Sequence, residues 1–75
     1  MSTFAESWQF PSEAKEQLGA ASYDIRPLQE TFRSGRAKFE VLFFDKANAL
    51  ISRRIGMELT SRKTGKKYHM VSRAQ

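Results

Sequence analysis

The sequence predicts a small α+β domain, in which short N-terminal helices pack on a three-stranded antiparallel sheet that ends in a basic C-terminal hairpin. Helix-start and helix-stop residues gather in the first half of the chain, whereas alternating apolar residues mark strands at 38–44, 57–62 and 67–72. The chain has 75 residues, of which 40% are hydrophobic, so it can bury one compact core. We therefore expect a single domain over residues 1–75.

The first 20 residues are expected to contain one short helix, preceded by a segment that fits two structures. The sequence Thr-Phe-Ala-Glu at 3–6 fits a capping box, so residues 1–10 form either a flexible arm or a single helical turn. The expected helix over 13–18 begins just after Pro11, and Gly19 closes it as a C-terminal glycine.

A further helix is expected between Asp24, as its N-cap, and Gly35, as its stop. Ile25, Leu28 and Phe32 recur between them at the three- and four-residue spacing of one helix face. This spacing predicts a helix that buries its apolar face against the sheet.

The segment 38–44 is expected to form a strand with two apolar faces. Phe39, Val41 and Phe43 lie on one face, and Leu42 and Phe44 lie on the other. Such a strand is either central in the sheet and covered on both sides, or part of a contact with a partner. Burial in the core is the more frequent case.

Residues 45–56 fit either of two structures. As a helix, the segment has Asp45 at its N-cap and Gly56 just past its end, which places basic residues near its C-terminus. As a strand, it needs a hairpin turn at 45–48 and accepts Arg53 on an otherwise apolar face. The two caps favour the helix.

The C-terminal residues are expected to form a hairpin with a three-residue loop at 63–65, because Gly65 suits the left-handed position of such a loop. That loop pairs Leu59 with His69 and places both on the core face. The predicted core comprises Leu18, Ile25, Leu28, Phe32, Phe39, Val41, Phe43, Leu50, Ile51, Ile55, Met57, Leu59 and Val71.

The composition offers little for catalysis or for cofactor binding. His69 is the sole histidine and there is no cysteine, so a Cys/His pair is impossible, and we expect His69 to be a partly buried structural residue. The acids show no metal-ligand spacing, and the sequence contains no glycine-rich phosphate loop. We expect no enzymatic activity, no cofactor and no metal.

No membrane segment is expected either. The longest apolar run covers the four residues 41–44, far below the roughly 18–20 residues that cross a bilayer. The first residues lack the basic stretch and apolar region of a secretory signal. We therefore expect a cytoplasmic protein.

Charge is distributed unevenly along the chain. Residues 46–75 carry eight Lys/Arg against one acid, whereas residues 1–45 carry five against seven. A basic segment attracts polyanions, and cations crowded at a hairpin tip repel one another unless a phosphate-bearing partner neutralises them. We expect a non-catalytic nucleic-acid-binding protein, accessory or regulatory, that binds DNA or RNA. The expected contact residues are Arg53, Arg54, Arg62, Lys63, Lys66, Lys67 and, for base stacking, Tyr68.

The alternative is a small protein-binding module that docks on a larger partner and modulates it, or that self-associates. Its support is the apolar excess at Trp8, Phe10, Leu42 and Phe44. Binding to anionic lipid is a weaker third option, because the basic segment lacks a continuous hydrophobic face.

Overall fold

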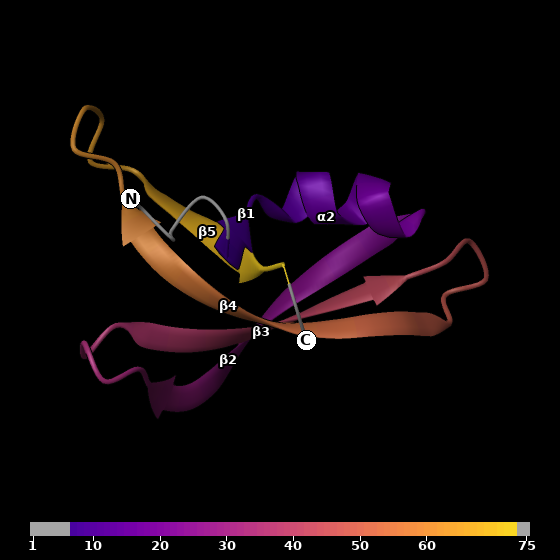
Figure 1. Cartoon of the computed structure of the whole chain (residues 1–75), viewed down its shortest axis with the longest axis horizontal. Helices are drawn as coiled ribbons and strands as arrows, with labels where there is room; N and C mark the ends of the chain where they lie inside the picture. The colour runs from indigo at the N-terminus through magenta and orange to yellow at the C-terminus, as the bar shows by residue number, and fades with distance from the viewer. Residues whose placement is uncertain (1–6, 74–75) are drawn as a thin grey trace.

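The computed structural model describes residues 7–73, which form one antiparallel sheet with one short helix. The sheet has five strands in the spatial order β1-β5-β4-β3-β2 (Figure 1). The predicted architecture, with several helices on a three-stranded sheet, is therefore wrong. The elements in chain order are β1 (Trp8–Gln9), α2 (Pro11–Leu18), β2 (Ser22–Thr31), β3 (Ala37–Phe44), β4 (Leu50–Thr60) and β5 (Lys67–Ser72).

Three successive hairpins build most of the sheet, because each of the strands β2 to β5 pairs with its neighbour in sequence. Strand β1 then pairs with β5 through Trp8↔Ser72 and Gln9↔Val71, which brings the two ends of the described chain together. The predicted capping box at 3–6 lies outside the described residues.

Helix α2 forms where its sequence signals predicted a helix. Pro11 occupies the first turn, and the Glu13 carboxylate accepts a hydrogen bond from the backbone N–H of Phe10 at 3.1 Å. Gly19 ends the helix in the left-handed conformation (φ 69°), and its N–H donates to the carbonyl of Glu16. This helix prediction is confirmed.

The core lies between α2 and one face of the sheet. Ala14 of the helix, Val41 and Phe43 of β3 and Val71 of β5 are fully buried together. The helix packs against both β5 and β2, which are separated in the sheet by two strands, so the sheet curls around it (Figure 1).

The segment predicted as a further helix is the edge strand β2. The Asp24 carboxylate pairs with Arg26 at 2.9 Å instead of capping a helix, and Gly35 lies in the turn to β3 with φ 88°. Pro27 is tolerated because an edge strand leaves one side without ladder hydrogen bonds. A bulge between Pro27 and Glu30 interrupts the alternation of side chains, so the apolar residues of this strand resemble a helical repeat.

Residues 45–56 form a turn and most of β4, so the preferred helix interpretation is wrong and the strand alternative is correct. The Asp45 carboxylate accepts hydrogen bonds from the N–H groups of Ala47 (2.8 Å) and Ala49 (2.9 Å). Asn48 adopts the left-handed conformation (φ 67°), which reverses the chain. An aspartate carboxylate accepts hydrogen bonds from nearby backbone N–H groups both in a turn and at a helix N-cap. The local sequence therefore does not distinguish the two structures.

The change from helix to strand also moves predicted core residues to the surface. Leu50, Ile51 and Ile55 are 47%, 43% and 37% exposed. The face of β4 toward α2 instead carries Gly56 and the partly buried Arg54.

The last hairpin is confirmed, but its register differs by one residue from the prediction. Leu59 pairs with Tyr68, and Glu58 pairs with His69. The loop has four residues, 62–65, because the N–H of Ser61 donates to the Lys66 carbonyl at 2.9 Å. A shift of one residue exchanges the two faces of a strand, so Tyr68 rather than His69 accompanies Leu59.

Strand β3 is central and is buried on both faces, as the covered-strand interpretation expected. On the face away from α2, Leu42 is 6% exposed and Phe44 is half-buried. Nearby, Trp8 packs edge-on against Phe32 (6.0 Å between ring centroids), and the Lys38 ammonium lies 5.1 Å from the centre of the Phe32 ring.

Candidate nucleic-acid interface

A shallow groove lies at the loop end of the β4–β5 hairpin, and we call it the tip groove. Its volume is about 630 Å³. The lining residues come from the position just before α2, the β2–β3 connection, both hairpin strands and the segment between them. They are Phe10, Arg36, Leu59, Thr60, Ser61, Arg62, Lys63 and Tyr68.

Two aromatic rings form one side of the tip groove. The ring centroids of Phe10 and Tyr68 are 6.2 Å apart with planes inclined at 48°, and the side chains are 49% and 37% exposed. The sheet register brings them together, because Gln9 pairs with Val71 and Phe10 therefore follows β1 toward the start of β5. Both rings are therefore partly accessible to a planar ligand.

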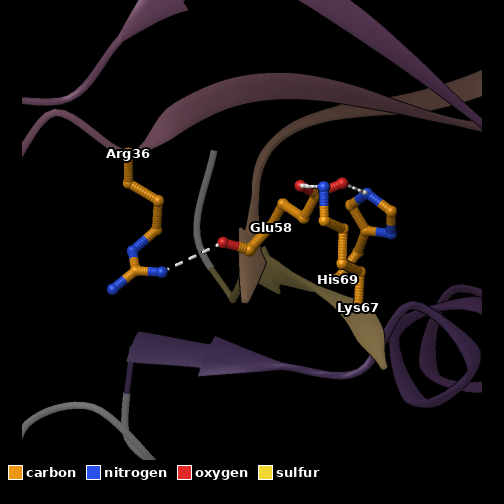
Figure 2. A network of polar contacts seen from close by, with 4 residues as sticks. All are labelled: Arg36, Glu58, Lys67 and His69. Carbon is orange, nitrogen blue, oxygen red and sulfur yellow. Dashed lines mark hydrogen bonds and ion pairs between the residues drawn. The ribbon is translucent and has the colours of Figure 1, made fainter. Parts of the chain in front are cut away.

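Cationic residues supply the other sides. Arg62 and Lys63 belong to the β4–β5 loop, and Arg36 comes from the β2–β3 connection. The Arg36 guanidinium donates from Nη1 to the backbone carbonyl of Glu58 at 3.1 Å, which holds it beside the strand pair (Figure 2). None of the lining residues is acidic, so the groove carries an uncompensated positive charge.

The loop has a defined backbone. The Ser61 hydroxyl accepts hydrogen bonds from the N–H groups of Lys63 and Thr64, both at 3.3 Å, and the Thr64 hydroxyl accepts one from Lys66 at 3.2 Å. Gly65 adopts φ 73°, which an L side chain rarely does. These hydrogen bonds fix the backbone of the loop that carries Arg62 and Lys63.

Three cations at the tip of the β4–β5 hairpin form what we call the tip cluster: Arg62 and Lys63 in the loop, and Lys66 just after it. Within residues 7–73 none of the three makes an ion pair, and all are exposed. The nearest acid on β4, Glu58, is engaged elsewhere. Its carboxylate oxygens lie 3.6 Å from the Lys67 ammonium and 3.5 Å from Nε2 of His69 (Figure 2).

His69 therefore has structural partners on the face toward α2. Its ring packs edge-on against Phe39 at 5.0 Å between centroids, and its side chain is 27% exposed. Lys67, which the sequence placed among the phosphate contacts, shares the same carboxylate.

Arg53 and Arg54 lie away from the tip groove, on opposite faces of β4. Seven residues, or roughly 23 Å of strand, separate Arg53 from Thr60. Arg53 pairs with Glu40 at 3.1 Å. Arg54 is partly buried and donates from Nη1 to the carbonyl of Ser72 at 3.3 Å.

The structure thus brings together Arg62, Lys63 and Tyr68 of the predicted contact residues, with Lys66 directly after the same loop. It adds Arg36, which sequence reasoning missed, and Phe10, which had been assigned only to protein binding. No local signal marks Arg36, because its position depends on the order of the strands and on the pairing of β3 with β4.

The four residues of the protein-binding alternative do not share one exposed surface. Leu42 is buried, Trp8 and Phe44 are half-buried, and Phe10 is exposed in the tip groove.

Among residues 7–73, no cluster of three or more histidine or acidic side chains is placed to hold a metal ion. In the same part of the chain, no helix has the length and apolar character needed to span a membrane. No family model matches the sequence, and no similar protein was found among curated proteins or among solved structures.

Proposed function

We propose that this protein is a non-catalytic nucleic-acid-binding protein that holds its ligand in the tip groove, in an accessory or regulatory role. Phosphates contact Arg62 and Lys63, with Lys66 beside them, and bases meet the rings of Phe10 and Tyr68. The observation that carries the proposal is the coincidence of two exposed rings and unpaired cations around one groove without a carboxylate.

The energetics of the loop support a phosphate ligand. Acidic partners accompany several cations elsewhere, as Asp24 does Arg26, Glu40 does Arg53 and Glu58 does Lys67. The tip cluster has no such partner among the described residues, and its like charges repel one another. A polyanion removes that repulsion and releases counterions, which makes binding favourable at low salt.

The test compares two doubly substituted proteins that lose the same charge. Arg62→Gln/Lys63→Gln removes cations of the tip groove, and Arg33→Gln/Lys46→Gln removes exposed cations of the other two turns. Fluorescence anisotropy with labelled DNA and RNA, single- and double-stranded, measures affinity between about 50 and 200 mM salt.

We expect the groove variant to bind more weakly than the control on every sequence. The slope of log affinity against log salt concentration becomes less steep by about 1.4 on single strands, or by about 1.8 on a duplex, because two phosphate contacts are lost. If both variants show the same affinity and the same slope, the groove is not the binding site and the proposal fails.

A further inference from the structure

We infer that the tip groove selects an unpaired base, so that the ligand of the proposed function is a single strand rather than a duplex. This inference rests on the proposed function and assigns its ligand class. An unstacked base lies on the exposed faces of Tyr68 and Phe10, and the adjoining phosphates lie on Arg36 and on Arg62 and Lys63.

The first argument is the order of side chains across the sheet. Tyr68 pairs with Leu59, and Arg36 reaches the carbonyl of Glu58 beside it, so an aromatic, an aliphatic and a cationic side chain follow one another across three strands. Two strand spacings, roughly 10 Å, separate the aromatic from the cationic end. A nucleotide has the same sequence of chemistry, from planar base through sugar to phosphate.

The second argument is access to the base. In a duplex each base is covered on both faces by its neighbours, so an aromatic side chain cannot stack on it without disrupting the helix. Phosphate contacts alone would need neither Tyr68 nor Phe10. The rings are 49% and 37% exposed at the groove, where exposed apolar surface is unfavourable unless a ligand covers it.

The third argument is size. A volume of about 630 Å³ falls within the range of roughly 300–1,000 Å³ that holds small-molecule ligands, which leaves room for one or two nucleotides. Because the two rings are inclined at 48° and already in contact, the base stacks on their outer faces and does not insert between them.

A rival geometry inserts the hairpin tip into the major groove of a duplex, as two-stranded ribbons do. In that geometry the bases stay stacked inside the duplex, where the rings of Phe10 and Tyr68 cannot lie on their faces. The two exposed rings would then have no ligand, so we favour the single strand. The duplex remains an outcome that the experiment detects.

The experiment uses three probes that share a phosphate backbone. They are a labelled oligothymidylate of about 12 nucleotides, a strand of the same length that keeps the sugars and phosphates but lacks the bases, and the oligothymidylate paired with oligoadenylate. Thymidine monophosphate serves as a competitor, to distinguish a strand from a free nucleotide. Each is titrated against the full chain at low salt.

The variants distinguish a loss of base stacking from a loss of folding. Tyr68→Leu removes the ring, and Tyr68→Phe retains it. Tyr23→Leu is the matched control, because Tyr23 is 40% exposed and its ring packs on Phe43 at 6.0 Å and 50°, nearly the geometry of the Phe10–Tyr68 pair. Circular dichroism establishes that each variant is folded before binding is compared.

We expect Tyr68→Leu to weaken binding of oligothymidylate about 5- to 150-fold, while Tyr68→Phe and Tyr23→Leu stay within about twofold of the unmodified protein. The abasic strand and the duplex should both bind more weakly than oligothymidylate. Thymidine monophosphate should compete only weakly, because it offers one phosphate where the strand offers several.

Equal affinity for the abasic strand and oligothymidylate, or tighter binding of the duplex, overturns the inference but leaves salt-dependent nucleic-acid binding intact. Tighter binding of the mononucleotide than of the strand overturns it as well. Absence of salt-dependent binding to any probe removes the proposed function itself, so the two failures are distinguishable. The abasic probe needs no variant, which keeps the inference testable if Tyr68→Leu fails to fold.

Discussion

Replacing Gly56 by alanine should destabilise the protein, although alanine ordinarily suits a strand better than glycine. Gly56 lies in β4 between Phe39 of β3 and Val71 of β5. A Cβ atom at this position would lie 3.0 Å from Cγ2 of Val41 and 3.2 Å from the carbonyl oxygen of Met70. Neither atom moves freely, because Val41 is fully buried and the carbonyl belongs to the ladder.

Two opposing effects set the size of the change. Inserting one carbon into a packed core costs about 1–3 kcal/mol, and alanine recovers about 0.5–1 kcal/mol that glycine loses in chain entropy. Taken at mid-range, these two effects leave a net loss of unfolding free energy of about 1 kcal/mol. In a domain of this size that lowers the melting temperature by roughly 4–8 °C.

Urea unfolding followed by far-UV circular dichroism measures this loss, and Val41→Ala supplies the control. Because Val41→Ala removes the methyl group at 3.0 Å, Gly56→Ala should cost less in that background, with a coupling energy of at least about 0.5 kcal/mol. A Gly56→Ala protein as stable as the parent would refute the reasoning. An equal cost in both backgrounds would show that Val41 is not the obstacle.

Three further predictions concern the Asp45 turn, the ion pairs of Glu58 and the partly buried Arg54. Asp45→Ala should lower the unfolding free energy by about 1 kcal/mol, and Asp45→Asn by less because it keeps an acceptor; equal thermal shifts would contradict this. Glu58→Gln should release Lys67 and tighten single-strand binding, with a salt slope steeper by up to about 0.7, whereas unchanged anisotropy titrations at low salt would count against it. Arg54→Met should lower the melting temperature without changing nucleic-acid affinity, because its guanidinium is bonded to the Ser72 carbonyl; weaker binding in a folded variant would return Arg54 to the contact surface.

Local signals predicted the elements whose ends are marked by unambiguous residues. Pro11 and Gly19 bracket α2, and alternation predicted β3 and β5. The alternation of Tyr23, Ile25 and Pro27 with polar residues also marked β2, but the bulge that follows hid it within a helical spacing. Asp45 was misread because the same carboxylate chemistry begins a helix or closes a turn.

The candidate site was predicted only in part, for a reason of register. A three-residue loop and a four-residue loop are both compatible with Gly65. The two loops shift the pairing of β5 with β4 by one residue, so they exchange the β5 side chains that share a face with a given β4 side chain. With the longer loop, Tyr68 joins Leu59 in the tip groove and His69 meets Glu58. The pairing depends on how the hairpin packs on the rest of the fold, where Val71 is buried together with Ala14, Val41 and Phe43.

The order of the amino acids is enough to show that this chain is basic toward its C-terminus, that its last hairpin ends in cations, and that it lacks the residues for thiol chemistry. Which cations have acidic partners and which do not follows instead from the folded arrangement of the strands. Ion pairs such as Arg53–Glu40 and Lys67–Glu58 join residues on neighbouring strands, so they depend on sheet order and pairing. Those are set by burial of apolar side chains far from the charges themselves, because burying them contributes more free energy than a surface ion pair does.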